Sequence, residues 1–241
     1  RASGRLSGRL AEADCPVMKA DGVIFDMDGL MFDTERLGLE GWKKAGRILG
    51  YPIGAEMVAR IRGCNRTDAE KMFKERYGEN FDYGRAREIR LNYAAREIEE
   101  NGLPVKPGLY SLLEFLKNRE LPMAVATACD SKTAHGNLEK AGIQEYFKAV
   151  ICGDEIRHAK PWPDIFICAA KRLGTGCGNT IVFEDSVNGI EAAYRAGCIP
   201  VMVPDLTVPD EAVQKKCFCV INSLCEAEAL FDSCSAAGRS V

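Results

Sequence analysis

The sequence has few histidines, no long apolar run and no excess of one charge, and each absence excludes a class of protein. Only 2 of the 241 residues are histidine and none of the 11 cysteines forms a Cys-x-x-Cys pair, so the usual ligand sets of structural zinc are missing. The chain contains no run of about 18 apolar residues, so no membrane-spanning helix is predicted. The net charge of -3 gives no field that attracts nucleic acid or acidic lipid. We therefore expect a small-molecule partner, with no nucleic acid and no membrane.

The ends and the cysteines of the chain carry little further information. The first residues lack the apolar stretch of a secretory signal, so a cytoplasmic protein is expected. Residues 1 to 17 are rich in Arg, Ser and Gly and are expected to form a disordered extension. The scattered cysteines are expected to be reduced thiols that pack as small core residues. The expected oligomeric state is a monomer or a weak dimer.

Short apolar runs and helical segments alternate along most of the chain. The runs are "GVIFDM", "PMAVAT", "KAVICG", "NTIVFE" and "IPVMVP", and segments such as "PGLYSLLEFLKNRE" and "PDIFICAAKRLG" lie between them. This alternation predicts an α/β fold with a doubly wound, mostly parallel, Rossmann-like sheet. Ligands of such sheets bind beyond the carboxyl ends of the strands.

The alternation stops in one long stretch after the first predicted strand. Charged, amphipathic helical segments occupy residues 34 to 103, and prolines mark the return to alternation. We expect this insertion to form a helical cap over a catalytic core made of residues 18 to 33 and 104 to 241. Such a cap can exclude water and select substrates.

The first predicted strand ends in two acidic residues, Asp26 and Asp28. If the chain stays extended, both side chains face the same way. One carboxylate can then attack or bind metal while its neighbour transfers protons. The competing interpretation is that they are turn residues that only cap the next helix.

A second acidic pair, Glu184 and Asp185, ends another predicted strand. Together with Asp26 these carboxylates suit Mg²⁺, which prefers oxygen ligands. The competing interpretation is that the pair opens the helix that follows, with Ser186 as its N-cap. Both interpretations can hold at once.

Two further polar residues lie where a phosphate can be bound. Lys160 directly precedes a proline, which keeps it out of a helix, and its ammonium can bind a phosphoryl group among the acids. Thr127 ends another predicted strand, and backbone N–H groups at the following helix start can hold phosphate oxygens. Taken singly, each has a simpler interpretation, a solvated loop lysine and a helix cap.

Taken together, these segments resemble the haloacid dehalogenase superfamily of phosphohydrolases. "DMDG", "VAT", "KPWPD" and "FEDS" are similar to its four motifs in order and spacing, over roughly residues 20 to 230. The insertion resembles that superfamily's helical cap. "FDMDGLMFDTE" and "GDEIRHAKPWPDIF" look most like the branch that contains β-phosphoglucomutases and sugar phosphatases.

The resemblance implies roles for the residues of the first motif. Asp26 would be the nucleophile that forms an aspartyl-phosphate, and it would bind Mg²⁺. Asp28 would be the general acid and base, with its backbone carbonyl as a further metal ligand. The dehalogenases proper lack the second aspartate of the first motif and need no metal, so Asp28 and the acidic pair count against a dehalogenase.

The resemblance also assigns the remaining motifs. Thr127, Ala128 and Lys160 would hold the phosphoryl oxygens, and Glu184 with Asp185 would complete the Mg²⁺ site. The implied function is a Mg²⁺-dependent phosphatase that hydrolyses a small phosphorylated metabolite, with a sugar phosphate as the expected substrate class.

The predicted cap contains arginines that can face the substrate. Arg66, in "RGCNRTDA", falls where a relative uses an arginine against a second phosphate, and a solvated arginine near a helix start is the alternative. Arg87 and Arg90 can also face the cleft, but a charged outer helix face is the preferred interpretation.

Two positions depart from the family pattern and keep other functions open. Gly38 occupies the position of a histidine that the mutases use as acid and base, which argues against a phosphomutase. Cys129 occupies a position where relatives often have serine, so phosphate binding is slightly altered or the thiol simply packs. The alternatives are a β-phosphoglucomutase-like mutase and a catalytically silent phosphate-binding protein.

Overall fold

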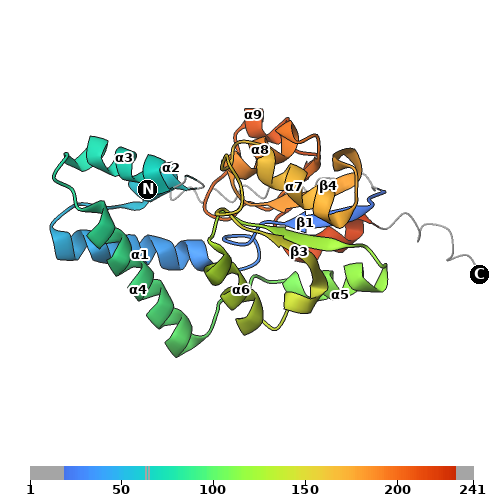
Figure 1. Cartoon of the computed structure of the whole chain (residues 1–241), viewed down its shortest axis with the longest axis horizontal. Helices are drawn as coiled ribbons and strands as arrows, with labels where there is room; N and C mark the ends of the chain where they lie inside the picture. The colour runs from blue at the N-terminus through green and yellow to red at the C-terminus, as the bar shows by residue number, and fades with distance from the viewer. Residues whose placement is uncertain (1–18, 63, 65, 232–241) are drawn as a thin grey trace, which may run out of the picture.

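A parallel sheet lies at the centre of the computed structural model, which describes residues 19–62, 64 and 66–231 (Figure 1). Its strand order is β3-β2-β1-β4-β5-β6, and every neighbouring pair is parallel. The strands are β1 (Gly22–Phe25), β2 (Met123–Ala126), β3 (Phe147–Ile151), β4 (Thr180–Glu184), β5 (Ile199–Met202) and β6 (Cys219–Val220). The predicted fold class is confirmed, and the short edge strand β6 is the one strand here that the sequence analysis did not predict.

Helices cover both faces of the sheet because the strand side chains alternate between two apolar clusters. Val23 and Phe25 of β1 join the cluster under α5 (Leu109–Asn118) and α6 (Ser131–Lys140). Ile24 joins the opposite cluster. That second cluster is covered by α7 (Asp164–Leu173) and α8 (Val187–Arg195). The sheet is thus buried on both faces, as its uninterrupted apolar runs predict.

Four further short helical segments lie within the described part of the chain. They are η1 (Gln144–Tyr146), η2 (Cys177–Asn179), α9 (Glu211–Gln214) and η3 (Leu224–Leu230). Eight of the described cysteines are free thiols, which agrees with the expected reduced state; they are Cys64, Cys129, Cys152, Cys168, Cys177, Cys198, Cys217 and Cys225. None of the described helices combines the length and the apolarity needed to cross a lipid bilayer.

A separate group of helices lies beside the carboxyl ends of the strands, on the left in Figure 1. It consists of α1 (Thr34–Leu49), α2 (Ala55–Ile61), α3 (Arg66–Tyr77) and α4 (Tyr83–Asn101). These helices have their own apolar cluster, in which the Phe73 ring lies 4.7 Å from Trp42 and 5.1 Å from Phe81. The predicted helical cap is therefore present, whereas its limits at residues 34 and 103 stay a prediction.

The order of the strands explains where a ligand can bind. The neighbours of β1 are β2 on one side and β4 on the other: the chain runs outward from β1 through β2 to β3, then crosses to β4 and runs outward on the other side. A crevice forms at such a switch point, beyond the strand ends. Asp26, Thr127 and Glu184 terminate or directly follow these three strands, so they meet at one edge.

Candidate active site

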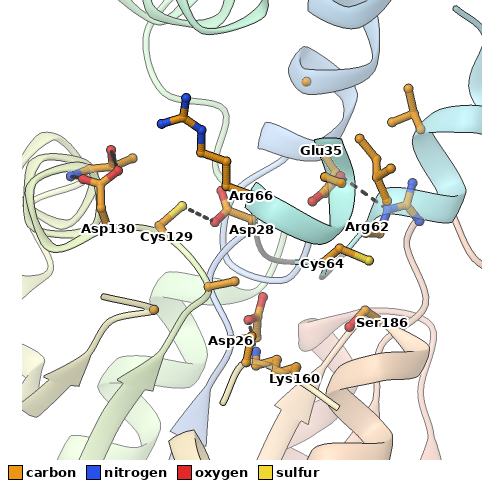
Figure 2. Close-up of a pocket in the computed structure, with 18 of the residues that line it drawn as sticks. Asp26, Asp28, Glu35, Arg62, Cys64, Arg66, Cys129, Asp130, Lys160 and Ser186 are labelled. Carbon is orange, nitrogen blue, oxygen red and sulfur yellow. Dashed lines mark hydrogen bonds and ion pairs between the residues drawn. The ribbon is translucent and has the colours of Figure 1, made fainter. Parts of the chain in front are cut away.

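A cavity of about 460 Å³ separates the strand ends from the cap helices. Side chains of the core and of the cap line it together, and Figure 2 shows several of them converging on it. Its core side is formed by five of the residues singled out from the sequence, namely Asp26, Asp28, Lys160, Glu184 and Asp185. Segments that are far apart in the sequence are thus brought to one place, as the alternation of strands and helices predicts.

The Lys160 ammonium lies at the floor of this cavity and uses all of its donors. Its Nζ atom is 2.5 Å from Asp26 Oδ1, 2.7 Å from Glu184 Oε1 and 3.2 Å from the carbonyl oxygen of Ala126. All three charged side chains are buried. Burial lowers the pKa of Lys160, but the charges of Asp26 and Glu184 outweigh burial and raise it. The interpretation of Lys160 as a solvated loop lysine is therefore wrong.

Asp26, Glu184 and Asp185 form a buried acidic cluster. One oxygen of each lies within 4.8 Å of the others, and Asp185 Oδ2 is buried without a hydrogen-bond partner among the described residues. Burial raises the pKa of Asp26, and attraction to the Lys160 ammonium lowers it by less. The pKa of Asp26 therefore lies well above its usual range. Burial and repulsion by Glu184 raise the pKa of Asp185 likewise. The Lys160 ammonium is one positive charge beside three carboxylates, so an excess of negative charge remains that a divalent cation would balance. Carboxylate oxygens are ligands that suit a hard cation.

Glycines make this close approach of carboxylates to backbone possible. A Cβ at Gly29, whose φ is +90°, would lie 2.3 Å from Asp185 Oδ2. A Cβ at Gly189 would lie 1.7 Å from Glu184 Oε1. Glu184 Oε2 accepts hydrogen bonds from the N–H and the hydroxyl of Ser186, whose hydroxyl also caps α8. The prediction that Ser186 is an N-cap is confirmed. Glu184 and Asp185, which precede it, also belong to the acidic cluster.

The Asp28 carboxylate is held by a different set of partners. Thr34 Oγ1 donates to Asp28 Oδ1 at 2.5 Å, and the Cys129 thiol donates to Asp28 Oδ2 at 2.9 Å (Figure 2). Thr127 Oγ1 lies 3.5 Å from the same oxygen and accepts from the Cys129 N–H. Asp28 therefore lies in the cavity wall with both oxygens oriented. Its side chain is not part of the acidic cluster, and its backbone carbonyl as a metal ligand stays a prediction.

Two of the three residues predicted to bind phosphate line the cavity, and the third does not. Ala128 and Lys160 line the cavity, whereas Thr127 is fully buried and is not among the lining residues. The Thr127 side chain contacts Asp28 and Cys129 instead. Its role as a phosphoryl ligand stays a prediction. The Cys129 thiol is not a simple packing residue, because it bonds to the Asp28 carboxylate.

A polar contact joins the cap to the core beside the cavity. Arg62 Nε lies 3.3 Å from Glu35 Oε2, and Arg62 Nη1 donates to Thr207 Oγ1 of the core at 2.6 Å. Asn188 of α8 donates to the Arg62 carbonyl at 3.2 Å. Burial and the Asp28 charge raise the pKa of Glu35, while Arg62 and Arg90 lower it. Neither Glu35 nor Arg62 could be identified from the sequence, because their partners are distant in the chain.

Arginines form the cap side of the cavity. Arg66, Arg87 and Arg90 all line it, and Figure 2 shows Arg66 reaching over Asp28 and Cys129. The preferred interpretation of Arg87 and Arg90 as outer-face residues is therefore wrong. The spacing of Tyr83, Arg87 and Arg90 was the available signal, since residues at i, i+4 and i+7 share one helix face. The role of Arg66 toward a phosphate stays a prediction.

Comparison with known proteins agrees with this geometry. Residues 23–203 match the family model of haloacid dehalogenase-like hydrolases. The chain is 29% identical over 182 residues to the phosphorylated carbohydrates phosphatase of Thermotoga maritima, covering 73% of this chain and 82% of the relative. It is 32% identical over 204 residues to a probable pseudouridine-5'-phosphatase of Drosophila melanogaster, covering 81% and 83%. The crystal structure of β-phosphoglucomutase from Clostridium difficile superposes with a TM-score of 0.72 at 27% identity, covering 86% of this chain and 92% of that one.

The matched model spans most of the chain, so the chain belongs to the haloacid dehalogenase-like hydrolase family. Within that family it is an enzyme of the phosphatase class, a phosphomonoester hydrolase. The predicted resemblance to the β-phosphoglucomutase and sugar-phosphatase branch is confirmed.

Proposed function

We propose that this protein is a Mg²⁺-dependent phosphatase that hydrolyses a small phosphorylated metabolite through an aspartyl-phosphate at Asp26, with a sugar phosphate as substrate class. The observation that carries the proposal is the Asp26 carboxylate at the cavity floor, 2.5 Å from Lys160 Nζ and beside Glu184 and Asp185. Two relatives, the phosphorylated carbohydrates phosphatase and the probable pseudouridine-5'-phosphatase, support the substrate class.

In the first proposed step, a carboxylate oxygen of Asp26 attacks the phosphorus of the bound phosphomonoester. The bond from phosphorus to the ester oxygen breaks as the new bond to Asp26 forms, and protonated Asp28 donates its proton to the leaving oxygen. Hydrogen bonds from Thr34 and Cys129 orient the Asp28 carboxyl group for this transfer. The Lys160 ammonium offsets negative charge on the transferred group.

In the second proposed step, water hydrolyses the aspartyl-phosphate. Asp28, now ionised, accepts a proton from the attacking water, and the bond between phosphorus and the Asp26 oxygen breaks. Inorganic phosphate leaves and both aspartates return to their starting protonation states. The cap helices limit the entry of bulk water while the intermediate exists.

Residues at the cavity floor fit the magnesium ion that this chemistry needs. Asp26, Asp185 and Glu184 would hold it, and the unpartnered Asp185 Oδ2 is a free oxygen donor for it. When bound, Mg²⁺ supplies positive charge that neutralises phosphoryl oxygens and the acidic cluster. Without such a cation, the Lys160 ammonium pairs with only two of the three buried carboxylates, those of Asp26 and Glu184.

A phosphomutase is the second candidate, because solved β-phosphoglucomutases share the fold at 26% and 27% identity. One feature of the cap disfavours it. Gly38 has no side chain to transfer protons, and the Arg90 guanidinium occupies the adjoining space. Hydrolysis therefore remains the better supported reaction.

The proposal is tested by phosphate release from a panel of sugar phosphates, nucleotides and an aryl phosphate, with Mg²⁺ or with EDTA. Asp26→Asn removes the nucleophile and is expected to abolish release, as is EDTA. Asp21→Asn is the matched control, because Asp21 lies at the other end of β1 and its contact with Asn179 needs only an oxygen acceptor. The control is expected to retain full activity.

Other outcomes would select the alternatives. Isomerisation of a hexose phosphate without phosphate release would replace hydrolysis by the mutase reaction. Tight binding of phosphorylated compounds with neither reaction would identify a silent binding protein. Full activity of Asp26→Asn would exclude the aspartyl-phosphate.

A further inference from the structure

Two segments of the chain connect the core to the cap, and they lie side by side. The first connection ends at Asp33, just before α1, and the second returns from α4 to the core through Lys106. The Asp33 N–H donates to the Pro104 carbonyl at 2.8 Å, and the Lys106 N–H donates to the Met31 carbonyl at 2.9 Å. An isolated antiparallel bridge also pairs the two connections. A movement of the cap relative to the core therefore acts on both connections together.

Four charged side chains form a cluster at these connections. Lys106 Nζ lies 2.7 Å from Asp205 Oδ1 and 3.3 Å from Asp33 Oδ1. Arg36 pairs with the same two acids, since its Nη2 lies 3.0 Å from Asp205 Oδ1 and its Nε lies 3.0 Å from Asp33 Oδ1. Asp205 belongs to the loop that follows β5, whereas the other three residues belong to the connections and to the first turn of α1. The cluster thus joins the cap, both connections and the core.

The Asp205 carboxylate is the most buried member of this cluster, and it depends on the two cations. Its side chain is 2% exposed, whereas that of Arg36 is 55% exposed. Both ion pairs reach Asp205 Oδ1, and Oδ2 is buried without a hydrogen-bond partner among the described residues. A buried carboxylate is costly unless cations compensate its charge. Asp205 therefore stabilises the arrangement in which Arg36 and Lys106 both stay close to it.

The loop that carries Asp205 is fixed to the floor of the cavity. The Val203 N–H donates to the Glu184 carbonyl at 2.8 Å, so the end of β5 is bonded to a member of the acidic cluster. Pro204 restricts the backbone between Val203 and Asp205. The position of Asp205 is therefore set by the core rather than by the cap.

The cap partner of Asp205 lies in the same helical turn as a residue that contacts the proposed general acid. Thr34 begins α1 and donates to Asp28 Oδ1 at 2.5 Å, and Glu35 beside it lines the cavity. Arg36 follows directly in the chain. The ion pair of Arg36 with Asp205 therefore fixes the turn that places the Thr34 hydroxyl against the Asp28 carboxylate.

We propose that Asp205 is a positioning residue that aligns the cap with the core and, through Arg36 and Thr34, keeps the Asp28 carboxyl group oriented. Asp205 is not among the residues that line the cavity, so it does not contact the substrate. The inference goes beyond the proposed function, because it concerns the alignment of the two regions rather than the compound that binds between them. Since Arg36 is largely exposed, its pair with Asp205 is weakened by salt.

The test is amide hydrogen exchange, followed by NMR at Asp33 and Lys106 in the full chain without substrate. Both N–H groups donate across the two connections, so they exchange when the connections separate. Asp205→Asn keeps the shape of the side chain but removes its charge, and it is expected to raise both exchange rates about tenfold. Arg36→Ala, at the exposed end of the contact, is expected to raise them about fivefold, with recovery in Arg36→Lys. The amides of β2 are the internal reference and are expected to keep their rates.

Two comparisons separate positioning from a general loss of stability. Raising NaCl from about 20 mM to about 500 mM is expected to accelerate exchange at the connections in wild type but to have little effect in Asp205→Asn. The double variant Arg36→Ala/Asp205→Asn is expected to exchange little faster than Asp205→Asn, because both substitutions break the same contact. Arg96→Ala is the matched control, because its partner Glu100 lies on the same cap helix. It is expected to keep the wild-type exchange rates.

Phosphate release connects the contact to the reaction. Asp205→Asn is expected to lower kcat about tenfold with a smaller change in KM, because the displaced turn affects the hydrogen bond to Asp28. Arg96→Ala is expected to keep the wild-type kcat.

Wild-type exchange at the connections in both Asp205→Asn and Arg36→Ala would overturn the proposal. Equal acceleration of the β2 amides would also overturn it, because the substitution would then act on the stability of the whole fold. Unchanged kcat in a variant with accelerated exchange would exclude the effect on Asp28. Failure of the proposed function is seen separately, as absent phosphate release by wild type, because hydrogen exchange does not depend on turnover.

Discussion

The two sides of the cavity carry opposite charges and differ in how completely the donors of their buried cations, Lys160 and Arg90, are satisfied. On the core side, Lys160 directs its donors at two carboxylates and a carbonyl oxygen within 3.2 Å. On the cap side, Arg90 retains a buried Nε without a partner among the described residues. The core side is thus organised before a ligand arrives, which is what charge stabilisation in catalysis requires. The cap side is left for the ligand to complete, so selectivity is expected to reside in the cap.

The largest expected effect comes from removing the cation of the core side. Lys160→Met keeps the volume but leaves buried carboxylates without their ammonium partner. Breaking a buried ion pair on one side costs about 3–5 kcal/mol of stability. Losing one charge-stabilising group costs about 10² to 10³-fold in kcat. Urea unfolding and steady-state phosphate release measure the two effects.

Magnesium provides the internal check on this prediction. Mg²⁺ is expected to restore part of the lost stability of Lys160→Met, since a cation bound only by the folded state stabilises it. Lys43→Met is the matched control, because Lys43 is partly exposed on α1 and forms a surface ion pair with Glu40 at 2.7 Å. Wild-type stability of Lys160→Met in EDTA would contradict the view that the core side depends on this ammonium.

The second effect separates the packing of the cap from the chemistry of the core. Phe73 is fully buried in the cap cluster, between Trp42 and Phe81. Phe73→Ala is expected to cost about 3–5 kcal/mol through the cavity it creates. Calorimetric Mg²⁺ titration of the variant is expected to give wild-type affinity, because the acidic cluster lies outside this helix cluster. Loss of Mg²⁺ binding would show that the two regions are not independent.

The same division explains how much could be predicted from the sequence. The core residues Asp26, Glu184 and Asp185 follow apolar runs, and parallel strands bring such ends to one edge, so their meeting could be predicted without coordinates. Lys160 lies in a loop, and only its resemblance to a motif suggested that it holds phosphoryl oxygens, while its burial could not be predicted. Its contact with Asp26 spans 134 positions of the chain.

The cap could be predicted as helical but not oriented. The spacing of Tyr83, Arg87 and Arg90 puts these residues on one face of α4, but it does not say that this face turns inward, and the arginines alone favour a solvated face. Packing of α4 against Gly38 and Gly41 of α1 decides which arginines turn inward, since a Cβ at Gly41 would lie 2.8 Å from the Arg90 carbonyl oxygen. That decision depends on the fit between two helices, which no short-range pattern contains.

A smaller effect is expected at the boundary between the two sides. The Cys129 thiol donates to Asp28 Oδ2 at 2.9 Å, and Cys129→Ala removes that donor. A hydrogen bond to a charged group contributes about 1.5 kcal/mol at the low end of its range, so kcat is expected to fall roughly tenfold. Cys129→Ser keeps a donor and is expected to retain most of the activity. Equal loss in both variants, or a change in KM alone, would contradict the orienting role.

The smallest effect is expected where the cap is fastened to the core. Thr207→Val keeps the shape of the side chain but removes the hydroxyl that accepts from Arg62 at 2.6 Å. Arg62 retains Glu35 at 3.3 Å, and its carbonyl still accepts from Asn188, so only part of the contact is lost. A loss of about 1 kcal/mol in cap docking corresponds to roughly a fivefold rise in KM. The chemical step takes place on the core side, so kcat is expected to change less.

Thr207→Ser is the control for this last prediction, because it retains the accepting oxygen. Its KM is expected to match wild type in the same steady-state assay. If Thr207→Val instead lowered kcat without raising KM, the Arg62 contact would act on the catalytic carboxylates through Glu35, whose pKa responds to Asp28. At this contact a cap residue would then influence the chemical step rather than substrate binding, and the core and cap sides would not differ there.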